Sequence, residues 1–441
     1  MLDDPDVAPV VSRLDPAAAA SVMRDVRGES LTAGWMTMAL SPHLPRGARV
    51  TSVNCEPTTI LVGSHSSSTT LLLELEGAAG VALSMTVFLK RVCVVDLPRR
   101  DPTKCAKDVQ SYQIEHCFYT ELAAQLRAAG LQLPDMLFGE STDVSVAGDL
   151  TRVGFLYLFA DLGATHATYL HVSYERMCAT MAWAARLHSI FWTAEGAAMP
   201  AALACMWDQG TYWALDKRPA SEVPSTGSSW RAFCEGWRHV APELFSRPEI
   251  IDLGYRLARQ ASRMDAWLRT RSPRTLVHGD LKGAHLFFRV DASTDSEPTV
   301  IDWQWSGFAS PLVDVVYAIQ SITAFADLQQ CGEERLLQAY LAALRTHGID
   351  LGEGLANQLY KAALLDYARI VLGYFFRGVS VSDIEREHEN ITELTHTREV
   401  AHALRFIGRV DDVLREIETL GDFDDASLCG MRHMRDAYEA P

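Results

Sequence analysis

The sequence lacks both long apolar runs and an excess of basic charge. A membrane-spanning helix needs about 20 consecutive apolar residues, and no stretch of the 441 residues approaches that length. Acidic residues outnumber basic ones by 56 to 40, which gives a formal net charge of −16. An acidic surface repels the phosphates of nucleic acid and of anionic lipid. We therefore expect no membrane partner and no nucleic-acid partner.

Paired cysteines and a secretory leader are also lacking. The nine cysteines are scattered and contain no C-x-x-C pair, which favours free thiols over disulfides or a zinc site. The acidic N-terminus has no basic start followed by an apolar run, so it does not read as a secretory signal. These absences indicate a cytoplasmic protein. Nothing in the sequence indicates its oligomeric state.

The order of the sequence patterns predicts an α+β fold. The chain is too long for one ordinary hydrophobic core. Residues 1–45 read as an N-terminal helical extension. Residues 46–160 contain several β-rich runs and one amphipathic stretch, expected as a helix at about 107–129. Residues 161–441 have mostly helical periodicity, so we expect a small β-rich N-lobe followed by a larger helical C-lobe.

Within the helical half, residues 196–230 break the periodicity. They combine prolines, a Ser/Gly/Pro cluster and several aromatic residues, which indicates a long excursion or a lid. The stretch WDQGTYWALDKRP at 207–219 could line an acceptor pocket or pack a lid onto the helices, and the sequence leaves both open. Further helices are expected at about 231–270, 312–346, 355–375 and 394–419.

A candidate for catalysis lies in LVHGDLKGAHLFF at 276–288. Asp280 follows a strand-like run, a position that suits a carboxylate accepting a hydrogen bond from a substrate hydroxyl. Lys282 could stabilise the charge of a transferred phosphoryl group. Asp302, in TVIDWQW, follows another strand-like run and suits a Mg²⁺ ligand. A hairpin-like connection would bring the two carboxylates to the same end of a sheet.

The segments HGDLKGAH and VIDW resemble the catalytic and metal-binding motifs of the aminoglycoside phosphotransferase and choline kinase superfamily. The most similar branch is the ecdysteroid-kinase-like, or CHK-type, phosphotransferases. The resemblance spans roughly residues 30–419, with the motifs in the family's order. It implies a bilobal protein-kinase-like fold, ATP and Mg²⁺ as cofactors, and transfer of the γ-phosphate to a hydroxyl of a small-molecule alcohol.

The resemblance also implies a nucleotide site. Lys90, in VFLK, lies where the family has its phosphate-binding lysine, and Glu115 lies where the family has the glutamate that pairs with this lysine. Gly63 and Ser64 begin a loop, GSHSSS, that would cover the phosphates. YLFADLG resembles the interlobe hinge and adds Asp161 to the nucleotide-binding residues.

Three further residues of the helical half match positions of the family. Asp314, in PLVDVVYAI, is expected to brace the catalytic loop through backbone hydrogen bonds. His278 is expected to orient the loop by hydrogen bonding. We favour a structural role for His188, because the other residues of its helical stripe are apolar.

Two departures from the family pattern leave a second interpretation open. The phosphate loop is rich in serine and keeps only Gly63. His285 stands where the family has a metal-binding Asn, and imidazole suits Mn²⁺ or Zn²⁺ better than hard Mg²⁺. The alternative is thus a catalytically weak or inactive nucleotide-binding or scaffold protein of the same fold. A protein kinase ranks last, because HGD replaces H-R-D and no A-P-E segment follows Asp302.

Overall fold

The computed structural model describes residues 31–55, 61–62, 66–77, 80–93, 102–141, 154–169, 171–387 and 399–419. The chain divides into two compact units. Unit 1 takes in Met1–Ala167, Phe287–Ala292 and Pro298–Trp305. Unit 2 takes in Thr168–Leu286, Ser293–Glu297 and Ser306–Pro441.

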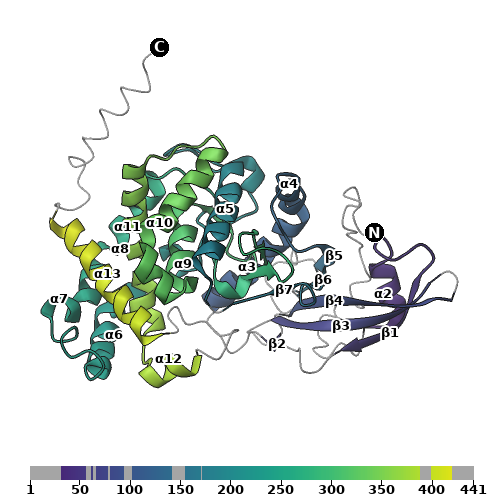
Figure 1. The fold of residues 1–441 in the computed structure, drawn as a ribbon, viewed down its shortest axis with the longest axis horizontal. Coiled ribbons are helices and arrows are strands. Elements are labelled where there is room, and N and C mark those ends of the chain that lie inside the picture. Colours follow the sequence, from purple (N-terminus) through teal and green to yellow (C-terminus); the bar gives the residue numbers. More distant parts are fainter. Residues whose placement is uncertain are drawn as a thin grey trace, which may run out of the picture. The chain divides into compact units, whose positions relative to one another are not determined.

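Unit 1 is built on an antiparallel sheet whose strand order is β1-β3-β4-β6-β5, with the short β2 paired to β3. Apolar residues alternate along the strands, because successive side chains of a strand point to opposite faces. Leu71, Leu73 and Leu75 of β3 are buried on the inner face, and α2 (Ala33–Ala39) packs on β1 (Figure 1). The strands are β1 (Arg49–Cys55), β2 (Leu61–Val62), β3 (Ser66–Glu76), β4 (Ala82–Cys93), β5 (Met136–Ser141) and β6 (Gly154–Ala160).

One long helical segment of unit 1 lies between β4 and β5 in the sequence. It consists of α3 (Pro102–Cys117), a π-helix (Phe118–Leu122) and α4 (Ala123–Ala128). The helix predicted at about 107–129 is therefore confirmed, with an earlier start and a π-helical turn that the periodicity does not reveal. Such turns are frequent at functional sites.

Two small sheets lie in the later part of the chain. β7 (His166–Ala167), β9 (Leu286–Arg289) and β10 (Thr299–Val300) form one in the order β10-β9-β7. β8 (Thr275–Val277) and β11 (Gly307–Ala309) form an antiparallel pair in unit 2. The predicted strands around the two aspartate motifs are thus confirmed.

Unit 2 is a bundle of helices around α9, whose eleven residues are all buried. α10 packs on α5, α8 packs on α6 and α11, and α11 also packs on α9 (Figure 1). Among the described residues, no helix is both long and apolar enough to cross a bilayer. The helices are α5 (Tyr174–Ile190), α6 (Glu222–Trp237), α7 (Pro248–Ile251), α8 (Leu253–Thr270), α9 (Leu312–Ile322), α10 (Phe325–Thr346), α11 (Glu353–Ile370), a π-helix (Val371–Phe375), α12 (Val381–Glu387) and α13 (Val400–Thr419).

The predicted excursion over 196–230 is wrong in its last part, because α6 already begins at Glu222. Pro224 lies in the first turn of α6, where the missing N–H costs no helical hydrogen bond. Gly227 is needed for packing, since a Cβ there would lie 2.3 Å from the Tyr255 ring of α8. The Ser/Gly/Pro cluster is therefore helical, and its small residues allow α6 and α8 to approach closely.

The prediction of free thiols holds for only part of the described cysteines. Cys55, Cys178, Cys234 and Cys331 are free, but Cys117 and Cys205 are disulfide-bonded. A disulfide requires Cα atoms only about 4.4–6.8 Å apart. The spacing of cysteines along the sequence does not show whether two of them meet this condition.

Candidate active site

The loop between β8 and β9 in unit 2 is held by one buried carboxylate. Asp314, on α9, accepts hydrogen bonds from the backbone N–H of His278 at 2.7 Å and of Gly279 at 2.9 Å. Gly279 has φ of +79°, a conformation that glycine adopts without steric cost. The predicted bracing of the loop by Asp314 is confirmed.

Asp314 is itself supported from α5. His188 Nε2 lies 3.4 Å from Asp314 Oδ2, and His188 Nδ1 lies 2.9 Å from the hydroxyl of Tyr340. The backbone carbonyl of His188 accepts a hydrogen bond from Thr275 Oγ1 on β8 at 2.6 Å. All of these side chains are buried. The contacts agree with a structural role for His188, which connects α5 to the base of the loop.

The Asp280 carboxylate has a donor on each oxygen. Tyr317, on α9, donates to Oδ1 at 3.1 Å, and Lys282 donates to Oδ2 at 2.9 Å. The Tyr212 hydroxyl lies 3.4 Å from that of Tyr317. Burial raises the pKa of Tyr317 well above its ordinary value, as do Tyr212 and Asp280, so its phenol keeps its proton and acts as a donor. Each oxygen has lone pairs left for an incoming hydroxyl.

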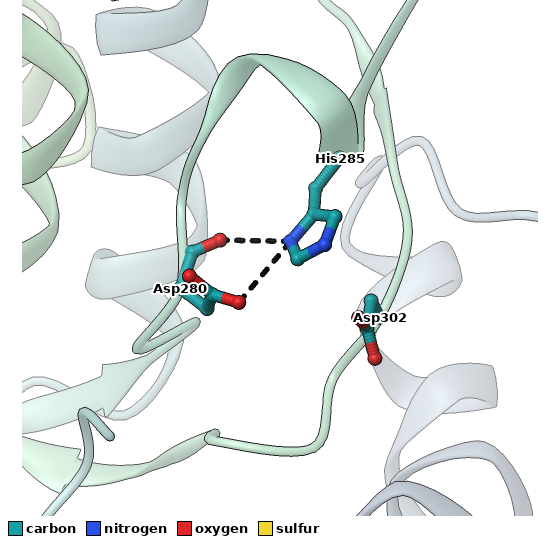
Figure 2. A group of neighbouring side chains, drawn as sticks. All are labelled: Asp280, His285 and Asp302. Carbon is teal, nitrogen blue, oxygen red and sulfur yellow. Dashed lines mark hydrogen bonds and ion pairs between the residues drawn. The ribbon is translucent and has the colours of Figure 1, made fainter. Parts of the chain in front are cut away.

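His285 ends a short 3₁₀ turn (Gly283–His285) in the same loop. Figure 2 shows its Nδ1 facing Asp280. Nδ1 lies 2.9 Å from the backbone carbonyl oxygen of Asp280 and 3.7 Å from Asp280 Oδ2. The backbone N–H of Lys282 donates to the same carbonyl at 2.9 Å. Asp280, Lys282 and His285, which the sequence singled out, therefore lie together in unit 2.

Unit 1 brings together Lys90, Glu115 and Asp302. Lys90 Nζ on β4 lies 2.7 Å from both carboxylate oxygens of Glu115 on α3, and 3.3 Å from Asp302 Oδ1. Burial acts to lower the pKa of Lys90, but Asp302 and Glu115 raise it well above its ordinary value. The amine is therefore a permanent cation between two carboxylates. The predicted pairing of Lys90 with Glu115 is confirmed.

The segment around Asp302 contacts α3 and the π-helix that follows it. The Trp303 ring stacks on Phe118 with centroids 3.8 Å apart, and Ser111 Oγ lies 3.4 Å from Gln304 Oε1. Ser111 and Glu115 are four residues apart, so they share one face of α3. Asp302 has φ of +66°, which is rare outside glycine and frequent at functional sites.

The other predicted nucleotide-binding residues fall outside these two groups. The Asp161 carboxylate follows β6 and accepts a hydrogen bond from the Gly163 backbone N–H at 3.0 Å, so it caps a turn. Gly63 and Ser64 lie outside the described residues.

Sequence reasoning missed Tyr317 and Tyr212. Tyr317 lies three residues after Asp314 on α9, so both face the catalytic loop, and this spacing was a usable signal. No comparable signal pointed to Tyr212, which lies in the ambiguous stretch 207–219. Its neighbour Trp213 packs edge-on against Tyr317, with centroids 5.1 Å apart. Part of that stretch therefore packs against the helix that carries the catalytic contacts.

One comparison with known protein families gives a match. The profile of a family described as "Phosphotransferase enzyme family" matches residues 109–353, more than half of the chain. A search of curated proteins finds no match.

Several solved structures are similar to the chain at low identity. The GDP complex of wild-type aminoglycoside 2'-phosphotransferase-IIIa is 13% identical, with 86% of this chain and 95% of that chain covered and a TM-score of 0.39. A macrolide 2'-phosphotransferase from Brachybacterium faecium is 14% identical, with 81% of this chain and 99% of that chain covered and a TM-score of 0.35. An aminoglycoside phosphotransferase from Alicyclobacillus acidocaldarius is 11% identical, with 88% of this chain and 98% of that chain covered and a TM-score of 0.39.

Proposed function

We propose, from the premise that the chain belongs to the phosphotransferase enzyme family, that it transfers the γ-phosphate of ATP to a hydroxyl group of a small molecule. The fold is kinase-like, with an antiparallel five-strand sheet followed by a largely helical region. The acceptor alcohol is not identified by the family.

The observation that carries the proposal is the ion-pair group of Lys90, Glu115 and Asp302. Kinases use a strand lysine on the ATP phosphates, a helix glutamate that holds this lysine, and an aspartate that binds the metal. The distances of 2.7 Å and 3.3 Å from Lys90 Nζ place these three groups in direct contact. Lys90 remains charged, since the two carboxylates raise its pKa. A cation of this kind is suited to hold phosphate oxygens.

The proposed chemistry assigns Asp280 to the acceptor. The acceptor hydroxyl oxygen forms a bond to the γ-phosphorus, the bond from that phosphorus to the β–γ bridging oxygen breaks, and ADP leaves. Asp280 orients the hydroxyl and receives its proton. Lys282, 2.9 Å from Asp280 Oδ2, adds a positive charge beside the transferred group.

A divalent cation is implied by the family, and the available donors fit one. Asp302, in the VIDW motif, offers a carboxylate, and His285, in the HGDLKGAH motif, offers an imidazole. Carboxylates suit Mg²⁺ and Mn²⁺, whereas an imidazole suits Mn²⁺ better. When bound, the cation would neutralise charge on the phosphates. We propose Asp302 and His285 as its ligands.

Two finer assignments rest on sequence motifs. HGDLKGAH, VIDW and PLVDVVYAI, taken in order, support the ecdysteroid-kinase-like branch. Gly63, Ser64 and Asp161 are proposed as further nucleotide-binding residues because of their positions in the phosphate loop and hinge motifs.

Asp280→Asn tests the proposed role of the carboxylate. We expect phosphoryl transfer to a panel of alcohols to be lost while the dissociation constant for ATP stays within about twofold, because Asp280 acts on the acceptor. Asp350→Asn, at an exposed aspartate paired with Arg345, is the matched control and should retain activity. Unchanged turnover in Asp280→Asn contradicts the role. ATP binding by the wild type without transfer to any alcohol would favour the alternative of a nucleotide-binding protein.

A further inference from the structure

The segment that carries Tyr212 has a constrained backbone in unit 2. Thr211 has φ of +82°, which is rare for a residue with a β-branched side chain. Gly210 lies against β8, and a Cβ there would be 2.3 Å from Val277 Cγ2. The backbone of Trp207, at the start of the segment, pairs with that of β11. Backbone strain of this kind persists only where the surrounding structure fixes it, and it is frequent at sites that hold ligands.

The Tyr212 hydroxyl lies close to the carboxylate proposed to act on the acceptor. It is 3.4 Å from the hydroxyl of Tyr317, which donates to Asp280 Oδ1. Burial raises the pKa of Tyr212 well above its ordinary value, and the negative charge of Asp280 raises it further. The Tyr212 residue as a whole is only half-buried. A molecule whose hydroxyl meets Asp280 therefore has the Tyr212 ring beside it.

Two further aromatic side chains continue from Tyr212 to the surface of unit 2. The Phe375 ring lies edge-on to Tyr212, with centroids 6.3 Å apart, and Tyr374 lies edge-on to Phe375 at 5.3 Å. Phe375 is half-buried and Tyr374 is 47% exposed. Both belong to the π-helix Val371–Phe375, a kind of turn that is frequent at functional sites. We call Tyr212, Phe375 and Tyr374 the aromatic row.

The charges beside the aromatic row disfavour a polycationic acceptor. The Arg218 guanidinium lies over the Tyr374 ring, 4.7 Å from its centroid, and also pairs with Glu222 at 2.6 Å. Because a cation already covers one face of Tyr374, a second cation on this ring is unfavourable. The row itself offers aromatic faces and edges, which bind apolar ring systems by offset stacking and edge-to-face contacts.

We propose that the aromatic row binds the acceptor, and that the acceptor is an alcohol whose hydroxyl is carried by an uncharged aromatic ring system. The inference rests on the proposed function, because the row begins beside Asp280. Ligand sites are typically lined by aromatic side chains, with a few polar groups that fix the orientation. Here the rings hold the flat body of the acceptor, and Asp280 receives its hydroxyl. The three residues of the row are thus specificity-determining residues.

Fluorine NMR of the full-length protein labelled with 3-fluorotyrosine tests the proposal without nucleotide. The probe is 2-naphthalenemethanol, a flat uncharged aryl alcohol, and the comparison is glucosamine, a cationic sugar. Tyr212→Phe and Tyr374→Phe each remove one resonance, which assigns that signal in the wild type. We expect both resonances to shift with 2-naphthalenemethanol and not with glucosamine. The resonance of Tyr255, which has Arg231 over its ring at the same 4.7 Å, should shift with neither.

Kinetics of transfer to 2-naphthalenemethanol extend the test. Tyr374→Ala should raise the KM for this alcohol roughly 2- to 10-fold, because one aromatic contact is lost. The kcat should stay unchanged, since Tyr374 holds the body of the acceptor and not its hydroxyl. Tyr255→Ala removes the same kind of contact between an arginine and a ring, and should keep both wild-type values. Melting temperatures verify that the variants are folded.

The outcomes separate this inference from the proposed function. Absence of shifts at Tyr212 and Tyr374, equal shifts with glucosamine, or an unchanged KM in folded Tyr374→Ala overturns the inference. Transfer of phosphate from ATP to other alcohols, detected by mass spectrometry, would then leave the phosphotransferase proposal standing. Shifts of both resonances without any phosphorylated product would overturn the phosphotransferase proposal and keep the aromatic row as a binding site for an aryl alcohol.

Discussion

The Tyr317 hydroxyl donates a hydrogen bond to Asp280 Oδ1 over 3.1 Å, from the buried helix α9 to the catalytic loop. The same helix holds that loop through Asp314, whose carboxylate accepts two of its backbone N–H groups. One helix therefore fixes both the backbone of the loop and the direction of the Asp280 carboxylate. Tyr317 is a positioning residue in this account, because it acts through Asp280.

Tyr317→Phe removes only the hydroxyl that orients Asp280. A hydrogen bond to a charged group contributes about 1.5–3 kcal/mol, so we expect kcat for phosphoryl transfer to fall roughly 10- to 100-fold. The KM for ATP should stay unchanged, since in this account Tyr317 acts through Asp280, which orients the acceptor. Steady-state kinetics checks both values. The control is Tyr360→Phe, which removes a buried hydroxyl bonded to Gln320 at 2.9 Å; an equal loss of kcat there would assign the effect to packing.

Glu115→Gln tests the ion pair with Lys90. The neutral amide keeps the shape of the side chain but removes a charged partner 2.7 Å from Nζ. We expect the dissociation constant for ATP to rise roughly 10- to 100-fold, because Lys90 is no longer held between two carboxylates. Isothermal titration calorimetry measures it. Glu297→Gln, which disrupts the pair with Arg186 in unit 2, should leave ATP affinity unchanged. Equal affinities in all three proteins would exclude the proposed role of the pair.

Asp314→Asn tests the bracing of the loop. The substitution leaves one oxygen to serve two backbone N–H groups and adds an NH₂ group that must find an acceptor in a buried site. A buried polar group without a partner costs about 1–3 kcal/mol, and the free energy of unfolding should fall by that amount. Urea denaturation measures the change, with the exposed Asp412→Asn as control. No difference between the two variants would mean that the loop does not depend on this carboxylate.

The burial of His402 leads us to expect that the protein loses stability in acid. Burial lowers its pKa from 6.5 to about 3, with further lowering by Arg405 and His171. Between these pH values the unfolded chain binds a proton that the folded protein excludes. The contribution of the neutral His402 to the free energy of unfolding is therefore complete above pH 6.5 and decreases as the pH falls toward 3. Between pH 6.5 and 5 the decrease is about 2 kcal/mol.

His402→Phe should reduce this pH dependence. The variant has no group to titrate at that position. The change in its free energy of unfolding between pH 6.5 and 5 should therefore be about 2 kcal/mol smaller than the change in the wild type. His347→Phe, at an exposed position, should keep the wild-type difference. The same pH dependence in all three proteins would contradict the assignment to His402.

The strands and the helix that carry the candidate site residues were predictable from the sequence. Lys90 at the end of a β-rich run and Glu115 on an amphipathic stretch belong to regular elements whose periodicity is visible. Asp280 and Asp302 each follow a strand. The local pattern predicted the strands and the helix that carry these residues, and the resemblance to the family motifs, taken in order, singled the residues out.

The parts that depend on tertiary packing were not predictable. Composition suggested a loop where α6 forms, because the need for Gly227 arises only from the Tyr255 ring of a neighbouring helix. Tyr212 reaches Tyr317 across 105 residues, and no periodicity reports such a contact. The contact of His285 Nδ1 with the backbone carbonyl of Asp280 at 2.9 Å likewise has no signal in the sequence pattern.

The melting temperature of the protein with ATP, measured in EDTA, Mg²⁺ and Mn²⁺ for the wild type, Lys90→Met and Lys361→Met, tests the central claim most directly. A ligand that binds only the folded state stabilises it by mass action, about 2.7 kcal/mol at 100 times its dissociation constant. Lys361 pairs with the exposed Glu416 and serves as the control. We predict a metal-dependent rise in the wild type and in Lys361→Met, with little or no rise in Lys90→Met. No rise with any metal, or an equal rise in all three proteins, would contradict the account.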